Sequence, residues 1–338
     1  MIRLTENEAL KDRHAFGVPA YSRYFLETDE LSELFDFKDR NKALWAKHLI
    51  IGEGSNLLFQ RDYPGFIIHP LSSGLEVLSK KNDYVLIEAG ASENWDNLVD
   101  WTVSQGFGGL ENLSMIPGSV GAAPVQNIGA FGVEAKDSVY EVLVADLQES
   151  TSFWIPKDKC RFGYRDSIFQ QKKNSNWLVW KVRFKLHLDN RVNLNYKGLK
   201  EQLKEISNPG IKDIRQAVMN LRTSKLPDPK EIGNAGSFFT NPIIPLKQAN
   251  ELISIFPEMP VYPSVQADHV KIAAGWLIEQ CGLKGYRQND AGIYSKQALV
   301  LVNYGNATGK QLFELANHVQ NTVLQKFGIQ LEPEVRIV

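Results

Sequence analysis

The stretch MIPGSVGAAPVQNIGAFG, residues 115–132, is the densest run of small residues in the chain. Four glycines and three alanines share one loop that two prolines interrupt. Because glycine has no Cβ, a loop of this composition lets the backbone approach another group closely. The sequence alone leaves open whether that group is a phosphate, a flat ring or a neighbouring helix.

The known dinucleotide and mononucleotide fingerprints are absent from this loop. Its glycine pairs, Gly118 with Gly121 and Gly129 with Gly132, do not form G-x-G-x-x-G ahead of a helix, and there is no G-K-[ST]. A second glycine loop, GEGSN at residues 52–56, follows a short apolar run. Two such loops can present backbone N–H groups to one pyrophosphate, or each can be a tight turn that needs glycine. Both interpretations stay open on the loops alone.

Length and composition predict a globular protein of two or three domains. The chain has 338 residues, of which 43% are hydrophobic and 23% charged, with a formal net charge of -1. This charge argues against nucleic acid or an anionic membrane as a partner. The two cysteines lie far apart, and neither a signal peptide nor a long apolar span is evident. We therefore expect a cytoplasmic protein.

The pattern of apolar residues changes near residues 205–215. Before this point short strands dominate, with one helix at residues 92–106 that Ser92 would cap. After it, helices are expected at 211–225, 269–282 and 308–328, with strands at 297–303 and 332–338. Thr308 and Gln311 have the spacing of a capping box for the last helix.

Two further motifs place polar groups among apolar ones. In CRFGYRDSIF, residues 160–169, Arg165 has the chemistry to bind a carboxylate in a bidentate manner, although the spacing alone favours a surface turn with an Arg–Asp pair. In GNAGSFFTNPI, residues 233–243, Ser237 lies between a glycine and two phenylalanines. We expect its hydroxyl in a dry pocket suited to proton transfer, or simply buried and bonded to the backbone.

The C-terminal EPEVRIV brings charged residues to one face if it forms a strand. Glu332, Glu334 and Arg336 alternate with apolar residues, so they would share either a solvated edge or a site. The six histidines are isolated and form no metal-binding spacing with the cysteines. We therefore expect no metal.

Taken together, these stretches resemble the UDP-N-acetylenolpyruvoylglucosamine reductase family of bacterial peptidoglycan synthesis. The matching stretches follow the family's order from about residue 14 to the C-terminus: IIGEGSNLLF, IPGSVGAAPVQNIGAFG, CRFGYRDSIF, LNYKGL, RTSKLPDP, GNAGSFFTNPI, AAGWLIEQCGLKG, QALVLVN and LEPEVRI. LNYKGL and the segment around Tyr262 resemble the longer of the family's two forms. One departure is RHAFG at residues 13–17, where the family pattern is closer to Asn-Thr-Phe-Gly.

The resemblance implies an α+β fold in three segments. Residues 1–72 and 73–208 would form a two-part FAD-binding unit of the vanillyl-alcohol-oxidase type, and residues 209–338 an α+β substrate-binding domain whose last strand returns to the flavin. FAD would be held without a covalent link. NADPH would give a hydride to FAD, which would pass it to the vinyl carbon of the nucleotide-sugar enolpyruvyl ether.

The resemblance also implies roles for individual residues. Ser237 would donate the proton, while Arg165 and Glu334 would stabilise the charge that develops on the substrate. The FAD-binding positions would be Gly52, Glu53, Gly54, Ser55, Asn56, Gly118, Ser119, Gly121, Ala122, Gln126, Asn127 and Gly129. The substrate-binding positions would be Tyr196, Lys225, Asn241, Tyr262, Lys284 and Gln297.

Two other functions compete with this one. An oxidase or dehydrogenase on the same flavin fold would act on another substrate, and a nucleotide-sugar sensor would bind without turnover. Of these, we expect the reductase, acting as a monomer on a small UDP-sugar and NADPH, with no nucleic-acid or membrane partner.

Overall fold

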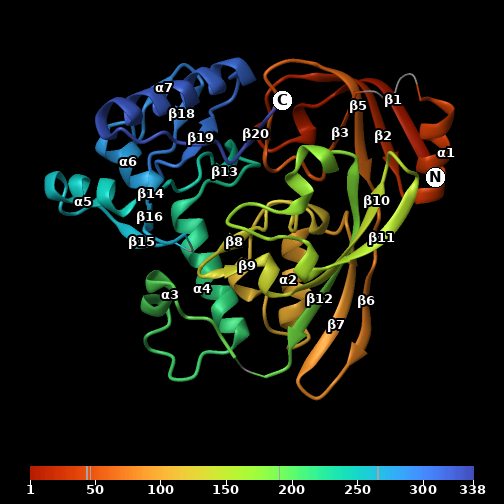
Figure 1. Cartoon of the computed structure of the whole chain (residues 1–338), viewed down its shortest axis with the longest axis horizontal. Coiled ribbons are helices and arrows are strands. Elements are labelled where there is room, and N and C mark those ends of the chain that lie inside the picture. The colour runs from red at the N-terminus through yellow and green to blue at the C-terminus, as the bar shows by residue number, and fades with distance from the viewer. Residues whose placement is uncertain (43–44, 46, 190, 265) are drawn as a thin grey trace. The chain divides into compact units, whose positions relative to one another are not determined.

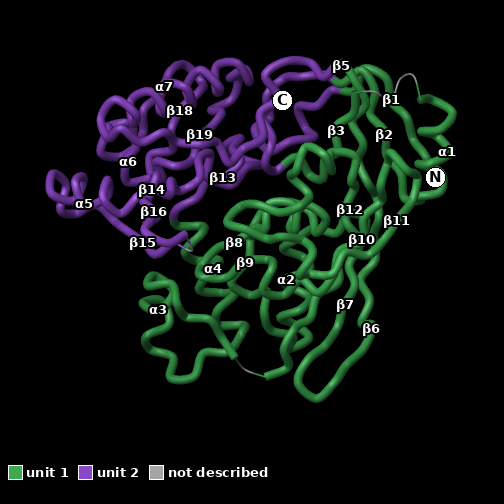
Figure 2. The backbone as a smooth tube through the Cα atoms, in the orientation of Figure 1, with its two compact units in different colours: residues 1–8, 22–54, 64–224 green, residues 9–21, 55–63, 225–338 purple. Residues whose placement is uncertain are grey.

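The computed structural model describes residues 1–42, 45, 47–189, 191–264 and 266–338 (Figure 1). Their contacts divide the chain into two compact units, which Figure 2 shows in different colours. Unit 1 comprises Met1–Glu8, Ser22–Gly54 and Pro64–Ser224, and unit 2 comprises Ala9–Tyr21, Ser55–Tyr63 and Lys225–Val338. The three contiguous segments expected from the sequence remain a prediction, since this division groups residues by contact and not by order.

Unit 1 is built on two sheets. The first has the strand order β1-β2-β5-β3, and helix α1 connects β2 to β3 along the chain. The bounds of these elements are β1 Ile2–Ala9, β2 Tyr21–Thr28, α1 Leu31–Arg40, β3 His48–Ile50 and β5 Tyr63–Pro70. Strands β3 and β5 pair in parallel, with Leu49 opposite Ile67.

The second sheet of unit 1 is antiparallel and has the order β11-β10-β12-β7-β6. Its strands are β6 Leu75–Lys80, β7 Tyr84–Gly90, β10 Val139–Asp146, β11 Thr151–Pro156 and β12 Trp177–His187. Helix α2 (Trp95–Ser104) follows β7 in the chain (Figure 1). Its apolar face packs on this sheet, where Trp95 meets Phe184 edge to face.

The glycine loop lies between α2 and β10 in the chain and adds little regular structure. It contains a 3-10 turn at Val120–Ala122 and the short hairpin of β8 (Gly129–Ala130) and β9 (Val133–Glu134). Two helices end the unit, α3 (Lys197–Gln202) and α4 (Ile211–Lys225). Their apolar sides form a small core of their own, which includes Leu199, Ile214 and Val218.

Unit 2 mixes small sheets with three helices. One sheet has the order β13-β19-β18-β17 and another β14-β16-β15, while β4 pairs in parallel with β20. The strands are β4 Leu57–Leu58, β13 Gly233–Ser237, β14 Ile243–Pro245, β15 Val261–Pro263, β16 His269–Ile272, β17 Arg287–Gln288, β18 Ala291–Ile293, β19 Val300–Asn303 and β20 Arg336–Ile337. The helices are α5 Leu246–Ile255, α6 Ala274–Gln280 and α7 Gly309–Phe327.

Helix α7 supplies much of the core of unit 2. Its residues Leu312, Leu315, Val319 and Val323 recur at helical spacing and are fully buried. They belong to one cluster with Leu277 of α6 and other apolar residues of the unit. The predicted capping box is confirmed, since Thr308 and Gln311 each accept the other's backbone N–H group.

Two expectations about local structure are wrong. Asn94 caps α2 by accepting the N–H of Asn97, and Ser92 instead donates its hydroxyl to the carbonyl of Ser72. The segment 269–282 is not one helix, because its first part pairs as β16 between β14 and β15. Valine and isoleucine at 270 and 272 favour a strand, and helix α6 begins only at Ala274.

None of the described helices combines the length and the apolar character that crossing a bilayer requires. In the same part of the chain, no three or more His, Cys, Asp or Glu side chains gather in a way that would hold a metal ion.

The cap of α7 gives a direct test of what holds this helix in place. We expect Thr308→Ala to lower the free energy of unfolding by about 1 kcal/mol, because the N–H of Gln311 loses its acceptor. Thr308→Ser keeps the hydroxyl and should stay close to the wild type. Urea unfolding followed by circular dichroism measures both, and equal losses in the two variants would contradict the cap.

Candidate functional site

The turn between β7 and α2 holds the first part of the glycine loop by main-chain bonds. The N–H of Gly121 donates to Ala91 at 2.9 Å, and that of Val120 donates to Glu93 at 2.8 Å. In the reverse direction, the N–H of Trp95 donates to Gly118 at 2.9 Å. The loop is therefore fixed as if it were an extra strand beside this turn.

Glycine is required at position 121 by this close approach. A Cβ at Gly121 would lie 2.6 Å from the Cβ of Ala91, closer than real Cβ atoms approach. Gly118 is required for another reason, since its φ of 125° is a conformation that other residues rarely adopt. Gly118 and Gly121 are therefore needed for the loop to pack against the rest of unit 1, before any ligand is considered.

Within unit 1, the structure brings residues 52–54, the first part of the second glycine loop, against residues 119–122 of the other loop. A Cβ at Gly52 would overlap the Oγ of Ser119 and would lie 3.9 Å from the Cβ of Ala122. The Nδ2 group of Asn94, the cap of α2, donates to the Oε1 of Glu53 at 3.0 Å. Sequence reasoning missed Asn94, although an Asn directly before a helix is a common cap.

The junction of these loops offers donors for an anion. In the described part of the chain, the backbone N–H groups of Gly52, Gly54 and Ser119 donate to no protein acceptor. Gly54 has a φ of 64°, the left-handed conformation found in loops whose N–H groups converge on an anion. Such a donor set suits a phosphate or pyrophosphate group.

Asn127 ties the middle of the loop to the segment that carries Arg165. Its side chain is fully buried, and its two Nδ2 hydrogens go to Glu134 at 3.1 Å and Gly163 at 2.8 Å. Its Oδ1 accepts the N–H of Lys136 at 2.9 Å. Both hydrogens of this amide are therefore used within the protein. Gln126 beside it is half-buried.

Arg165 lies on a tight turn against the end of the loop. The N–H of Gly163 donates to the carbonyl of Asp166 at 2.9 Å, and Arg165 between them has a φ of 52°. The guanidinium donates to the carbonyl of Gly129 at 2.6 Å and lies over the ring of Tyr164. A Cβ at Gly129 would come within 2.9 Å of this guanidinium, so glycine there lets Arg165 pack closely.

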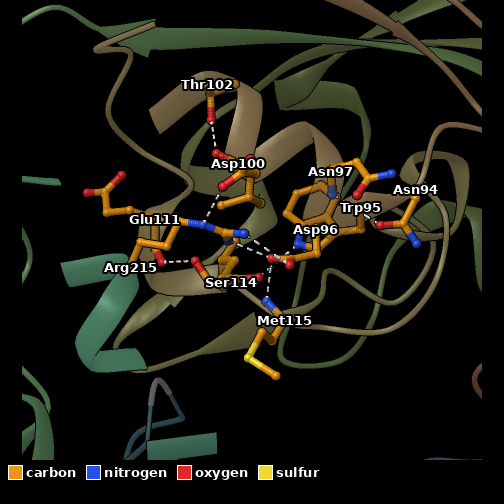
Figure 3. Close-up of polar contacts among 12 residues, drawn as sticks. Asn94, Trp95, Asp96, Asn97, Asp100, Thr102, Glu111, Ser114, Met115 and Arg215 are labelled. Carbon is orange, nitrogen blue, oxygen red and sulfur yellow. Dashed lines mark hydrogen bonds and ion pairs between the residues drawn. The ribbon is translucent and has the colours of Figure 1, made fainter. Parts of the chain in front are cut away.

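An ion pair between α2 and α4 fixes the start of the loop (Figure 3). The buried Arg215 binds both carboxylate oxygens of Asp96, at 2.7 and 3.1 Å, and Asp100 at 3.0 Å. The other bond to Asp96 Oδ1 comes from the N–H of Met115 at 2.6 Å, the first residue of the loop. Sequence reasoning missed Arg215, although an arginine within the apolar stripe of α4 indicates a buried charge without identifying its partner.

The same contacts shift the titration of Asp96. Burial alone would raise the pKa of this carboxyl, but the hydrogen bonds from Arg215 and Met115 and the positive charge of Arg215 bring its pKa below the ordinary value of 3.8. The carboxylate form of Asp96 therefore stabilises unit 1 at neutral pH.

Ser237 ends strand β13 in unit 2 and is exposed, so the expected burial of this hydroxyl is wrong. An irregularity in the pairing with β19, between Asn234 and Ser237, explains the difference. Gly236 takes a φ of 68° and donates its N–H to the Oδ1 of Asn234 at 3.0 Å. The strand then turns Phe238 into the core and leaves Ser237 at the surface.

The C-terminal segment brings Glu334 next to this strand. The N–H of Glu334 donates to the carbonyl of Phe238 at 2.8 Å, and its own carbonyl accepts the Nδ2 of Asn56 at 3.0 Å. The N–H of Arg336 donates to Asn56 at 3.1 Å, and Val338 pairs with Leu58. Only Arg336–Ile337 forms a strand, so the predicted strand over 332–338 is longer than the observed one.

The remaining predicted substrate residues are spread over both units. In unit 2, Asn241 accepts the N–H of Ala274 at 2.9 Å, and Gln297 lies beside Gly275, so both are at the start of α6. Lys284 forms an ion pair with Glu279 at 2.8 Å. Tyr262 lies exposed on the edge strand β15, and Lys225 ends α4. In unit 1, Tyr196 directly precedes α3.

Comparison with known proteins shows similarity over the whole chain. Residues 27–151 match the FAD binding domain family, and residues 228–338 match the family described as UDP-N-acetylenolpyruvoylglucosamine reductase, C-terminal domain. The chain is 45% identical over 332 residues to the UDP-N-acetylenolpyruvoylglucosamine reductase of Chromobacterium violaceum, covering 97% of each protein. It is 41% identical over 340 residues to that of Flavobacterium johnsoniae, covering 100% of each.

A solved structure agrees with these relatives. The crystal structure of UDP-N-acetylenolpyruvylglucosamine reductase from Thermus caldophilus matches with a TM-score of 0.71 and 25% identity, covering 100% of this chain and 99% of that one. The predicted fold class, an FAD-binding unit followed by a C-terminal α+β domain, is confirmed by these matches and by the observed mixture of helices and strands.

The ion pair of Asp96 makes a prediction about stability and pH. We expect Asp96→Asn to lower the free energy of unfolding at pH 7 by roughly 1.5–3 kcal/mol, the range for hydrogen bonds to charged groups. Because the folded pKa of Asp96 is depressed, this difference from the wild type should be complete above pH 5 and shrink as the pH falls below 4. Urea titrations at several pH values measure it.

Asp100→Asn is the matched control, since Asp100 is largely exposed and makes one bond to the same arginine. We expect a loss below about 1 kcal/mol for it. A loss in Asp96→Asn that equals the control, or that does not depend on pH, would contradict the proposed strength of this pair.

Proposed function

Since this chain belongs to the UDP-N-acetylenolpyruvoylglucosamine reductase family, we propose that it reduces the enolpyruvyl ether of UDP-N-acetylglucosamine to UDP-N-acetylmuramate with NADPH and FAD. The observation that supports this most is the contact of residues 52–54 with residues 119–122, with free N–H groups, in the unit that also carries Arg165. Identities of 41–45% over nearly whole relatives support the substrate.

The reaction balances as one hydride and one proton added across a carbon–carbon double bond. The hydride leaves NADPH, which becomes NADP⁺, and finally forms the C–H bond at the terminal vinyl carbon. The π electrons move to the neighbouring carbon, next to the carboxylate, where a proton completes the product. Negative charge therefore builds up on the carboxylate side of the substrate before the proton arrives.

The residues at the loop junction suit non-covalent FAD. Bound there, FAD supplies the carrier that accepts a hydride from the nicotinamide and releases it to the substrate. The N–H groups of Gly52, Gly54 and Ser119 would donate hydrogen bonds to its pyrophosphate. Because Gly118 and Gly121 have no side chain, the backbone of the loop could approach the bound FAD closely. The other predicted FAD positions on the two loops are part of this proposal: Glu53, Ser55, Asn56, Ala122, Gln126, Asn127 and Gly129.

Three residues would carry the chemistry on the substrate. Arg165 would bind the carboxylate and stabilise the charge that develops there, since a guanidinium matches a carboxylate with two parallel bonds. The exposed hydroxyl of Ser237 would give the proton, and the left-handed Gly236 beside it sets the direction of this side chain. Glu334 would assist as a donor in its protonated form.

The nucleotide part of the substrate would be held by the remaining predicted residues. Lys225 and Lys284 carry the charge that a diphosphate needs, and Tyr196 and Tyr262 are aromatic and exposed, as stacking or lid residues must be. Asn241 and Gln297 lie together at the start of α6 and would add hydrogen bonds. The proposal also includes a monomer that works in the cytoplasm.

The two half-reactions test the proposed role of Ser237 as proton donor separately from the binding of FAD and NADPH. In Ser237→Ala we expect bleaching of the flavin band by NADPH at the wild-type rate, and a loss of at least about 100-fold in its recovery on adding the enolpyruvyl substrate. The physical reason is that only the second half-reaction needs a proton donor. Anaerobic stopped-flow absorbance measures the two half-reactions one at a time.

Ser254→Ala on α5 is the matched control, because its hydroxyl bonds only the carbonyl of Glu251 within the helix. It should leave both half-reactions unchanged. If Ser237→Ala slows both half-reactions equally, Ser237 has a structural role and the proposed proton transfer is wrong.

A further inference from the structure

Phe131, near the end of the glycine loop, is held in an unfavourable conformation. Its φ is 50°, a left-handed value that is unusual for a bulky residue and costs free energy. Residues of this kind persist only where the surroundings fix them, and they gather at functional sites. The conformation of Phe131 therefore points to a role of this residue at the proposed site.

The ring of Phe131 joins the loop to the helices that end unit 1. It packs against the small apolar core of α3 and α4, and it meets the ring of Tyr196 edge to face with centroids 5.0 Å apart. The interplanar angle is 86°, which is the favourable geometry for an aromatic pair. Tyr196 itself stays 39% exposed, so one side of its ring is fixed while the residue remains open to a ligand.

Two asparagine side chains tie the main chain of the same two segments together. Asn112, only 1% exposed, donates its two Nδ2 hydrogens to the carbonyls of Phe131 and Asn193, both at 3.0 Å. Asn193 donates its own Nδ2 to the carbonyl of Gly132 at 3.1 Å and accepts the N–H of Asn195. The segment that carries Tyr196 is therefore bound to the loop by side-chain amides.

We infer that Phe131 and Asn112 are positioning residues. From the end of the glycine loop they hold Tyr196 in place for the nucleotide-sugar diphosphate. This inference rests on the proposed function of Tyr196 as a substrate ligand. Phe131 packs against the ring of Tyr196, and Asn112 binds the main chain at Phe131 in the loop and at Asn193 in the segment that carries Tyr196. The affinity for the nucleotide sugar then depends on two residues that do not themselves touch it.

A positioning role differs measurably from a merely structural one. If the two residues only stabilised unit 1, their replacement would lower FAD occupancy and slow both half-reactions together. If they position Tyr196, the first half-reaction and the maximal rate of the second stay the same, and only the substrate concentration needed for the second rises.

The test compares Phe131→Leu with the wild-type holoenzyme. We expect equal FAD content and equal bleaching by NADPH, with a half-saturating concentration of UDP-N-acetylglucosamine enolpyruvate raised about three- to ten-fold in the recovery step. Phe131→Tyr, which keeps the ring, should restore the wild-type value. Combining Phe131→Leu with Tyr196→Leu should add nothing to Tyr196→Leu alone. Additive effects, or an unchanged half-saturating concentration in Phe131→Leu, would overturn the inference.

Phe153→Leu is the matched control, because Phe153 makes an edge-to-face pair with Trp177 on the sheet of the same unit. It should change none of these quantities. Asn112→Leu, which has a similar volume, no donor and no charge, should resemble Phe131→Leu.

Hydrogen exchange separates this inference from the proposed function. In Phe131→Leu the amides of residues 193–203 should exchange faster than in the wild type, while those of β10 should not change. Unchanged exchange at 193–203 would overturn the positioning role whatever the enzyme reduces. A wild-type flavin that the nucleotide sugar does not reoxidise would refute the proposed function instead.

Discussion

The close main-chain contact between the glycine loop and the turn after β7 is the constraint on which unit 1 depends. Three backbone hydrogen bonds hold Gly118, Val120 and Gly121 against this turn, and the last requires that residue 121 carries no side chain. Once this contact is formed, the Oγ of Ser119 fills the space where Gly52 lacks a Cβ. A larger residue at either glycine would separate the two loops that carry the free N–H groups.

The rest of unit 1 holds the ends of this loop. Asp96, a carboxylate paired with Arg215, accepts the N–H of the first residue of the loop. Asn127 binds the middle of the loop to the turn that carries Arg165. Phe131 then anchors its end to the core of α3 and α4. Unit 2 uses a comparable device, since Asn56 binds the main chain of Glu334 and Arg336 and thereby fixes the C-terminal segment beside the strand of Ser237. In both units a loop of the proposed site is held by side-chain amides and main-chain bonds.

Local features were predictable from the sequence, and long-range partners were not. The spacing of apolar residues predicts α4, and the pair Thr308 and Gln311 predicts the start of α7, because both signals lie within a few residues. The strand at 269–272 was missed because Val270 and Ile272 give only a weak local preference, and the pairing with β14 and β15 that decides for a strand is not visible in one sequence. The partner of Asp96 lies 119 residues away, a separation over which a single sequence gives no pairing signal.

In the candidate site, too, the features that depend on distant parts of the chain could not be predicted from the sequence. Family resemblance selected Arg165, Ser237 and Glu334, and periodicity alone would have left each as an ordinary turn, strand or edge residue. The exposure of Ser237 could not be predicted, since it depends on how β13 pairs with β19. The use of both amide hydrogens of Asn127 within the protein likewise depends on tertiary contacts.

The most direct test of the central claim is an anaerobic absorbance titration of the purified holoenzyme. We expect one equivalent of NADPH to bleach the flavin band, and one equivalent of UDP-N-acetylglucosamine enolpyruvate to restore it without oxygen. A protein that binds no FAD, or a band that returns only when oxygen is admitted, would contradict the claim that this chain passes a hydride from NADPH to the enolpyruvyl ether.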